Sequence, residues 1–287
     1  MIALNFVLVG PMKTGTSWIY EYFKFHKQVC VPLNVKETFF FDVKYSRGFE
    51  WYFSHFNSQG DQIVGEVAPT YFHSPLAPER IYDLNPNCQI VITLREPLDR
   101  LVSLYFHFLQ RGIINKSDSF KDLFRQHSEF LESSFYYRNS LMWLNLFGQD
   151  RVKILLYENF KNSQFKFMEN LSSYLGLNVI DIPPHLNHKV NDSKVPIDRN
   201  LAKLVYAVVH FLRYYDIDLV VNLGKHLGLK KLLFNNKTFD FSLAQDDYNF
   251  VFEMVAEDLE MFSKNIDIDL TPWHEIWDSR GLKPLYK

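Results

Sequence analysis

The sequence has few cysteines, almost no net charge and no long apolar run. Its 287 residues include two cysteines, Cys30 and Cys88, and no C-x-x-C pair. This argues against a disulfide scaffold or a zinc site and predicts a reducing, cytoplasmic location. The formal net charge of −2 argues against a nucleic-acid or anionic-membrane binder, because such proteins carry excess positive charge. The apolar start, Met1–Gly10, is far shorter than the ~20 residues that span a bilayer, so no transmembrane segment is predicted.

Aromatic residues, in contrast, are abundant, with 27 Phe and 16 Tyr. Aromatic side chains that fill a core explain this content, and so does an aromatic-lined cleft for an acceptor molecule. Hydrophobic residues at 47% and charged residues at 22% are typical of a globular protein rather than a disordered one.

Short apolar runs alternate with longer helical patterns along the chain, which is typical of an α/β fold built on a parallel sheet. The predicted strands are Ala3–Val9, Gln62–Glu66, Gln89–Leu94 and Val152–Tyr157. The predicted helices are Thr16–His26, Leu98–Arg111, Phe120–Phe130, Tyr136–Phe147, Gln164–Leu175, Leu201–Leu223 and Tyr248–Phe262. The proline-containing stretch 181–199 predicts a long loop that caps a site. We expect one domain over residues 1–287, with residues 200–287 as its helical C-terminal part.

The strongest local signal is the turn Gly10–Ser17 (GPMKTGTS), which follows the first predicted strand and opens the first predicted helix. A helix N-terminus presents free N–H groups and partial positive charge, so it attracts phosphate. Lys13 adds a full charge, and three hydroxyl residues add donors. The lysine precedes the second glycine, so the Walker order G-x-x-x-x-G-K-[ST] is not reproduced. The plainer alternative is an N-cap cluster beside a tight turn.

A second cluster, Arg95–Arg100 (REPLDR), follows the third predicted strand and opens another helix. Arg95 stands at the carboxyl end of a strand, where open α/β sheets bind ligands, and Ser103 lies about two helical turns further on. Taken alone, Arg95 is also explained by a salt bridge and Ser103 by a solvated helix face. Together the two clusters predict separate sites for the 5′ and 3′ phosphates of one nucleotide.

These motifs resemble those of the sulfotransferases that use 3′-phosphoadenosine 5′-phosphosulfate (PAPS). Lys13–Ser17 is similar to their 5′-phosphosulfate loop, K-[TS]-G-[TS]-[TS], and Arg95–Tyr105 to their 3′-phosphate element, R-x-P-x-x-R-x-x-S-x-Y. The similarity is strongest with the heparan-sulfate-type enzymes and their bacterial relatives. It covers about residues 2–176, including Lys36–Asp42, Arg47–Tyr52, Gly65–Phe72, Ser134–Tyr136 and Leu156–Phe160.

The resemblance implies a P-loop-like three-layer fold, PAPS as the co-substrate and a transfer that needs no metal. The residues that it implies for the 5′-phosphosulfate are Lys13, Thr14, Gly15, Thr16 and Ser17, and those for the 3′-phosphate are Arg95 and Ser103. Further cofactor-binding residues implied in the same way are Trp18, Tyr136 and Lys189. The last of these belongs to Lys189–Lys194, which takes the part of the family's cap motif, K-G-R.

Sulfuryl transfer needs in-line placement and charge stabilisation more than covalent chemistry. We expect Lys13 to stabilise the leaving phosphate oxygen and Glu37 to act as general base toward an acceptor hydroxyl or, less favourably, an amine. The plainer interpretation of Glu37 is a surface carboxylate paired with Lys36. Lys36 and Asp42 are predicted to bind the acceptor, although Asp42 is equally suited to capping the following turn. Glu66, at a strand end, is predicted to support the site or the fold.

Two departures from the glycosaminoglycan 3-O-enzymes concern the acceptor. Phe39 stands where they carry a His, and Val67 where they carry a Lys. The loss of these polar contacts favours a neutral glycan, a lipid-like molecule or a small hydroxylated metabolite as acceptor. The alternatives to a sulfotransferase are a P-loop-type nucleotide-dependent phosphotransferase, which the lysine order disfavours, and a catalytically inactive nucleotide-binding protein, which the presence of Lys13 and Glu37 disfavours.

Overall fold

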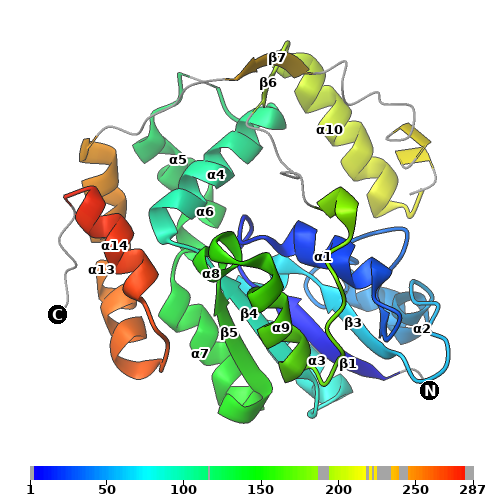
Figure 1. Cartoon of the computed structure of the whole chain (residues 1–287). Coiled ribbons are helices and arrows are strands. Elements are labelled where there is room, and N and C mark those ends of the chain that lie inside the picture. The colour runs from blue at the N-terminus through cyan, green and yellow to red at the C-terminus, as the bar shows by residue number, and fades with distance from the viewer. Residues whose placement is uncertain are drawn as a thin grey trace.

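Five parallel strands form the centre of the computed structural model, in the order β2-β3-β1-β4-β5 (Figure 1). The structure describes residues 3–115, 117–186, 194–217, 220–221, 223–224, 234–238 and 245–281. The strands are β1 (Leu4–Val9), β2 (Val29–Cys30), β3 (Ile63–Val67), β4 (Gln89–Leu94) and β5 (Val152–Leu156). The predicted α/β fold with a central parallel sheet flanked by helices is confirmed. β2 has only two residues, too few for a recognisable sequence pattern.

Both faces of the sheet are buried, as the continuous apolar runs of its strands predict. In β1, Val7 and Val9 belong to one hydrophobic cluster, which also includes Leu4 from before an irregularity in the pairing of the strand, and Phe6 and Leu8 belong to a second cluster. Successive side chains of a strand point to opposite faces, so the two clusters are the cores on the two sides of the sheet.

Helices cover each face. The cluster around Phe6 includes residues of α1 (Thr16–Phe25) and α9 (Gln164–Tyr174). The cluster around Leu4 includes residues of the helices of the other face, which are α3 (Ala77–Leu84), α4 (Pro97–Gln110), α5 (Phe120–Gln126), α6 (Ser128–Glu132), α7 (Tyr136–Phe147), α13 (Gln245–Asn265) and α14 (Thr271–Ser279). The two C-terminal helices therefore share a core with the sheet and lie beside α7 in Figure 1.

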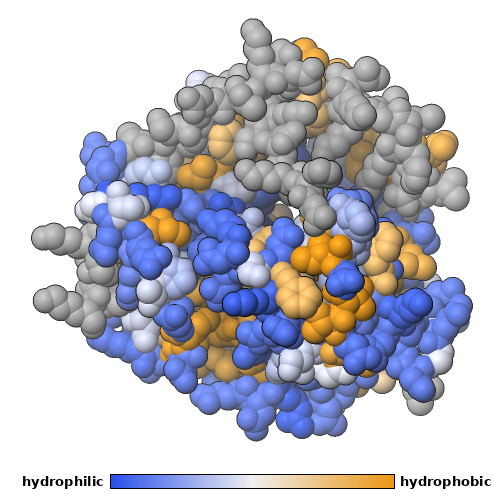
Figure 2. Space-filling view, in the orientation of Figure 1, coloured by the Kyte–Doolittle hydropathy of each residue, from blue (hydrophilic) through white to orange (hydrophobic). Residues whose placement is uncertain are grey.

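The remaining elements are α2 (Gly48–Phe53), α8 (Tyr157–Asn162), α10 (Arg199–Tyr214) and a small antiparallel pair of β6 (Lys194–Pro196) and β7 (Phe234–Thr238). In Figure 1, α10 is at the upper right of the view, above α1. The molecular face in Figure 2 is mostly hydrophilic, with apolar patches between. None of the described helices is long and apolar enough to cross a bilayer.

Three predicted elements differ from the structure. The helix predicted over 120–130 is two helices, because His127 between α5 and α6 is extended, with φ −129° and ψ 96°. The helix predicted from Leu201 to Leu223 is wrong in extent, since α10 ends at Tyr214 and Asp216 adopts a left-handed φ of 61°, a conformation that aspartate tolerates. The predicted loop 181–199 contains a 3₁₀ turn, Pro184–Leu186, and β6.

The sheet order creates a single switch point. From β1 the chain moves outward to β2, whereas β4 lies on the opposite side of β1 from β3. The carboxyl ends of β1 and β4 are therefore adjacent, and open α/β sheets bind ligands at such a reversal. The turn Gly10–Ser17 follows β1, and Arg95 follows β4.

Candidate active site

The turn after β1 packs against β4 at Gly10 and against the Tyr157 ring at Gly15, so a side chain at either glycine would be crowded. Gly10 has φ 138°, and a Cβ there would lie 2.3 Å from the Thr93 carbonyl oxygen. Gly15 has φ 88°, and its Cβ would meet the Tyr157 ring at 3.0 Å. Lys13 is also left-handed, with φ 80°. Successive turns of this kind direct backbone N–H groups into a concavity that suits an anion.

The structure does not support the alternative of an N-cap cluster. The N-cap of α1 is Gly15, which has no side chain to cap the helix. The Thr14 hydroxyl is buried, donates to the Pro11 carbonyl at 3.0 Å and lies 2.8 Å from the Thr93 hydroxyl, so it ties the turn to β4. The Thr16 hydroxyl accepts from Lys36 Nζ at 3.0 Å.

Arg95 joins the second predicted cluster to this turn. Its Nη1 donates to the Lys13 carbonyl at 3.4 Å, and its guanidinium lies 5.0 Å from the centre of the Tyr157 ring. Arg95 Nε is buried and has no hydrogen-bond partner in the part of the chain that the structure describes. Ser103 is half-buried in α4 and follows Asp99 by four residues, so the two lie on the same side of that helix. Residues that are 82 positions apart in the sequence thus meet at one place.

Three other residues predicted to bind the cofactor lie differently. The ring of Tyr136 is fully buried, and its hydroxyl donates to the Arg95 carbonyl at 2.8 Å. Trp18 is also buried, and its indole nitrogen donates to the Leu186 carbonyl at 3.0 Å. Both geometries suit positioning of neighbouring segments better than direct contact with a ligand. Lys189 lies outside the described residues.

Glu37 and Lys36 form an ion pair at the edge of the turn. Lys36 Nζ donates to Glu37 Oε1 at 3.0 Å and to the Thr16 hydroxyl at 3.0 Å. The pair predicted by the plainer interpretation of Glu37 is therefore present, but it is not a freely solvated one, because the two side chains are only 21% and 18% exposed. Lys36 links the carboxylate of Glu37 to the N-terminus of α1.

Asp42 has one partner in its own turn and another in the 3₁₀ turn Pro69–His73. Its carboxylate accepts from the Val43 amide at 2.6 Å and from the Thr70 hydroxyl at 2.8 Å. Burial raises the pKa of Asp42. This geometry favours the turn-capping interpretation of Asp42 over acceptor binding.

Glu66 sits at the centre of a buried hydrogen-bond network next to Glu37. Its Oε1 accepts from the Thr38 amide at 2.6 Å and the Thr38 hydroxyl at 2.8 Å, and its Oε2 accepts from the Tyr52 hydroxyl at 3.1 Å and the Tyr71 hydroxyl at 3.2 Å. Burial raises the pKa of Glu66 to about 7, although these hydrogen bonds act against the shift. The network fixes Thr38 and therefore the backbone of Glu37.

The raised pKa of Glu66 predicts a pH-dependent stability. Since the folded state holds this proton more tightly, the stabilisation is complete below about pH 4.5 and is lost as the pH rises through about 7. Relative to Glu66→Gln, the wild-type free energy of unfolding should fall by up to about 3 kcal/mol over that interval. Urea unfolding of both proteins from pH 4.5 to 7.5 measures this. Parallel pH curves for the two proteins would contradict it, and the exposed Glu21→Gln provides the control.

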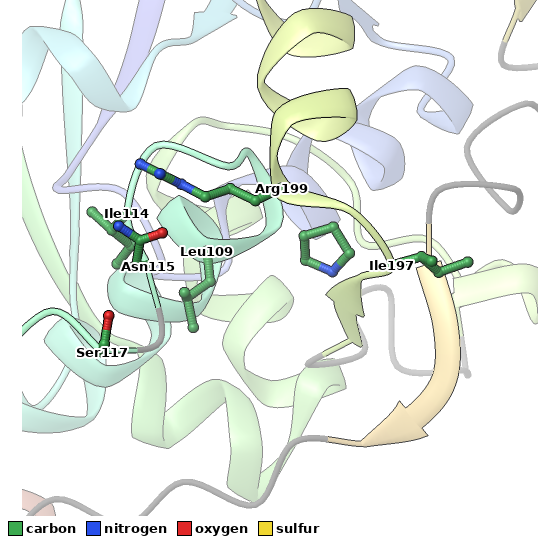
Figure 3. A pocket seen from close by; sticks show the side chains of 7 residues that line it. Leu109, Ile114, Asn115, Ser117, Ile197 and Arg199 are labelled. Carbon is green, nitrogen blue, oxygen red and sulfur yellow. The ribbon is translucent and has the colours of Figure 1, made fainter.

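Two cavities border α10. One of about 390 Å³ lies between the end of α4 and the start of α10 (Figure 3). There Arg199 donates to the carbonyls of Gly112 and Ile113, at 3.2 and 3.3 Å, and none of the predicted site residues lines it. The second cavity, of about 710 Å³, is lined mainly by residues of α10, which are Lys203, Tyr206, Ala207, His210, Phe211 and Tyr214.

The second cavity lies within electrostatic reach of Glu37. Arg111 donates to the hydroxyl of Tyr206, one of its lining residues, at 3.1 Å. Burial lowers the pKa of Arg111, whereas Tyr206 and Glu37 act to raise it. The far end of α10 is held by Asp216, which accepts from the Trp51 indole at 3.0 Å and from Lys44 at 3.2 Å. The end of α10 is thus anchored to Lys44 and Trp51, which follow Glu37 in the sequence.

Comparisons with known proteins identify relatives of this chain. The curated relatives include the membrane-associated sulfotransferase kil1 of Dictyostelium discoideum, 30% identical over 137 residues (45% of this chain and 29% of that protein). They also include the bifunctional heparan sulfate N-deacetylase/N-sulfotransferase 4 of Mus musculus, 27% identical over 206 residues (64% and 23%). The chain therefore matches less than a third of the length of either relative.

The fold itself also has a solved counterpart. A crystal structure of a sulfotransferase from Alicyclobacillus acidocaldarius superposes with a TM-score of 0.68 at 20% identity and covers 96% of this chain and 100% of that one. The family profile described as "Sulfotransferase domain" matches residues 5–216, well over half of the chain. This chain belongs to the sulfotransferase family.

Proposed function

We propose that the protein transfers a sulfuryl group from PAPS to a hydroxyl of a glycan or a small-molecule acceptor. The observation that carries the proposal is the contact between Arg95 and the Lys13 carbonyl, which unites the two phosphate elements in one cradle. The left-handed backbone at Lys13 and Gly15 is typical of turns that direct N–H groups toward an anion, and Arg95 Nε has no hydrogen-bond partner among the described residues.

In this proposal the 5′-phosphosulfate lies against the turn formed by Lys13–Ser17, and the 3′-phosphate lies between Arg95 and Ser103. Glu37 takes the proton of the acceptor hydroxyl while that oxygen bonds to sulfur. The bond between sulfur and the 5′-phosphate oxygen breaks, and Lys13 stabilises the charge on that oxygen. Lys36 holds Glu37 near α1, and the network around Glu66 fixes its backbone.

The acceptor approaches, in our proposal, from the cavity between α10 and the turn at Ile113. The aromatic walls of this cavity, which include Tyr206 and Phe211, suit the apolar face of a sugar ring or a small hydroxylated molecule. An amine acceptor is the alternative, because one relative is named as an N-sulfotransferase. A screen of hydroxyl and amine acceptors with labelled PAPS distinguishes the two.

Nucleotide binding tests the donor site. Arg95→Ala should lower the affinity for adenosine 3′,5′-bisphosphate by about tenfold or more, because a charge-assisted contact to phosphate is lost. The affinity for adenosine 5′-monophosphate should change by less than about threefold. Calorimetry without metal measures both nucleotides, with the exposed Arg125→Ala as control. Equal losses for the two nucleotides would remove Arg95 from the 3′-phosphate site. A wild-type preference for ATP with Mg²⁺ would favour a phosphotransferase instead.

A further inference from the structure

The last described helix, α14, reaches the base of the proposed 3′-phosphate site from outside the region that the family profile matches. Trp273 and Trp277 are one helical turn apart and fully buried. The Trp277 indole donates to Glu96 Oε1 at 2.8 Å, and the Trp273 indole donates to Glu158 Oε2 at 2.8 Å. Both tryptophans therefore bind carboxylates that are themselves buried.

The carboxylates of Glu96 and Glu158 fix the backbone directly after Arg95. Glu96 is the N-cap of α4, and its side chain accepts from the amides of Leu98 and Asp99 at 3.1 and 2.7 Å. The Glu96 amide donates to Glu158 Oε1 at 3.2 Å. Because buried carboxylates need several partners to remain in place, the two indoles help to fix the chain at Arg95.

Arg280, just after α14, adds the charge that this arrangement needs. Its Nη1 lies 3.2 Å from Glu96 Oε2, and its Nη2 pairs with Asp99 Oδ1. The other oxygen of Asp99 is 3.9 Å from Arg95 Nη2 and 4.0 Å from Lys161 Nζ. Asp99 thus competes with any phosphate for Arg95, and Arg280 offsets its negative charge.

We propose that Arg280 is a positioning residue of the donor site: it neutralises Asp99 and so leaves the Arg95 guanidinium to the 3′-phosphate. This inference rests on the proposed function, since it needs the 3′-phosphate to bind at Arg95. It gives the C-terminal helix a part in donor recognition that is distinct from its packing in the core.

The test compares two nucleotides in four proteins: wild type, Arg280→Met, Arg280→Met/Asp99→Asn and the control Arg125→Met, whose arginine pairs with Asp122 on the surface of α5. We expect Arg280→Met to lower the affinity for adenosine 3′,5′-bisphosphate about tenfold, the size of effect expected when one charge-assisted contact is lost. The affinity for adenosine 5′-monophosphate should fall less than about twofold. Removing the charge of Asp99 in the double variant should restore most of the lost affinity.

The outcomes separate the two proposals. If the wild-type protein does not distinguish the bisphosphate from the monophosphate, the proposed function fails. If it does, and Arg280→Met keeps the wild-type ratio, loses both nucleotides equally or is not rescued by Asp99→Asn, the inference about Arg280 is overturned. Should Arg280→Met not fold, Arg280→Gln keeps a polar side chain and removes the charge. A bisphosphate-specific loss of at least about threefold in that variant then supports the inference, and an unchanged ratio overturns it.

Discussion

Glu37→Gln is expected to lower kcat by roughly 10²–10⁴-fold, the range for removal of a general base. Glutamine keeps the size of the side chain and can still contact Lys36, whose Nζ lies 3.0 Å from Glu37 Oε1, but it cannot accept a proton from the acceptor. The affinity for adenosine 3′,5′-bisphosphate should stay within about threefold of wild type, because the carboxylate does not contact either phosphate in the proposed arrangement. Steady-state kinetics and calorimetry measure the two quantities.

Glu21→Gln provides the matched control, since Glu21 also pairs with a lysine, Lys24 at 3.1 Å, but on the exposed side of α1. Full activity of Glu37→Gln would remove Glu37 from the mechanism. A loss of nucleotide affinity as large as the loss of kcat would mean that the Lys36–Glu37 pair mainly holds the turn.

Lys13→Met should lower kcat by roughly 10²–10³-fold, the effect of removing one preorganised group that stabilises developing charge. Lys13 has a left-handed φ of 80°, and methionine is no better and no worse suited to that conformation, so the shape of the turn should survive. The affinity for the nucleotide product should fall less than kcat, because the charge on the leaving phosphate oxygen grows along the reaction. Single-turnover rates and product binding distinguish the two.

Lys24→Met, in the last turn of α1, serves as the control for Lys13→Met. Equal losses in kcat and in product affinity would show that Lys13 binds phosphate uniformly and does not act on the leaving group. An unchanged kcat would place the leaving oxygen elsewhere in the site.

The sheet and the two turns proposed to bind phosphate are predictable from the sequence because their signals are local. The apolar run of β1 followed at once by Gly10, Lys13 and Gly15 describes a strand, a turn and a helix start within 16 residues. Arg95 follows β4 in the same way. Neighbouring strands then bring these turns together, a consequence of sheet order that the general rule for α/β folds anticipates.

What the sequence does not reveal depends on contacts between distant residues. Glu66 stands in an apolar strand, yet only the fold shows that its partners are Thr38, Tyr52 and Tyr71. Tyr136 reads as a cofactor ligand by its place in a motif, but the fold buries it behind Arg95. The contact of Trp277 with Glu96 spans 181 positions, and no periodicity or local motif encodes such a pairing.

The N-cap of α1 is a glycine and the first turn of that helix has no acidic residue, so neither position supplies a side chain that offsets the partial charge at the helix start. In the proposed function, a bound nucleotide would place negative charge at this helix start. Donor binding would then raise the free energy of unfolding. The empty protein would be its less stable form, and a saturating donor would conceal part of the damage done by destabilising substitutions. Comparisons of variant stability are therefore meaningful only at a stated nucleotide concentration.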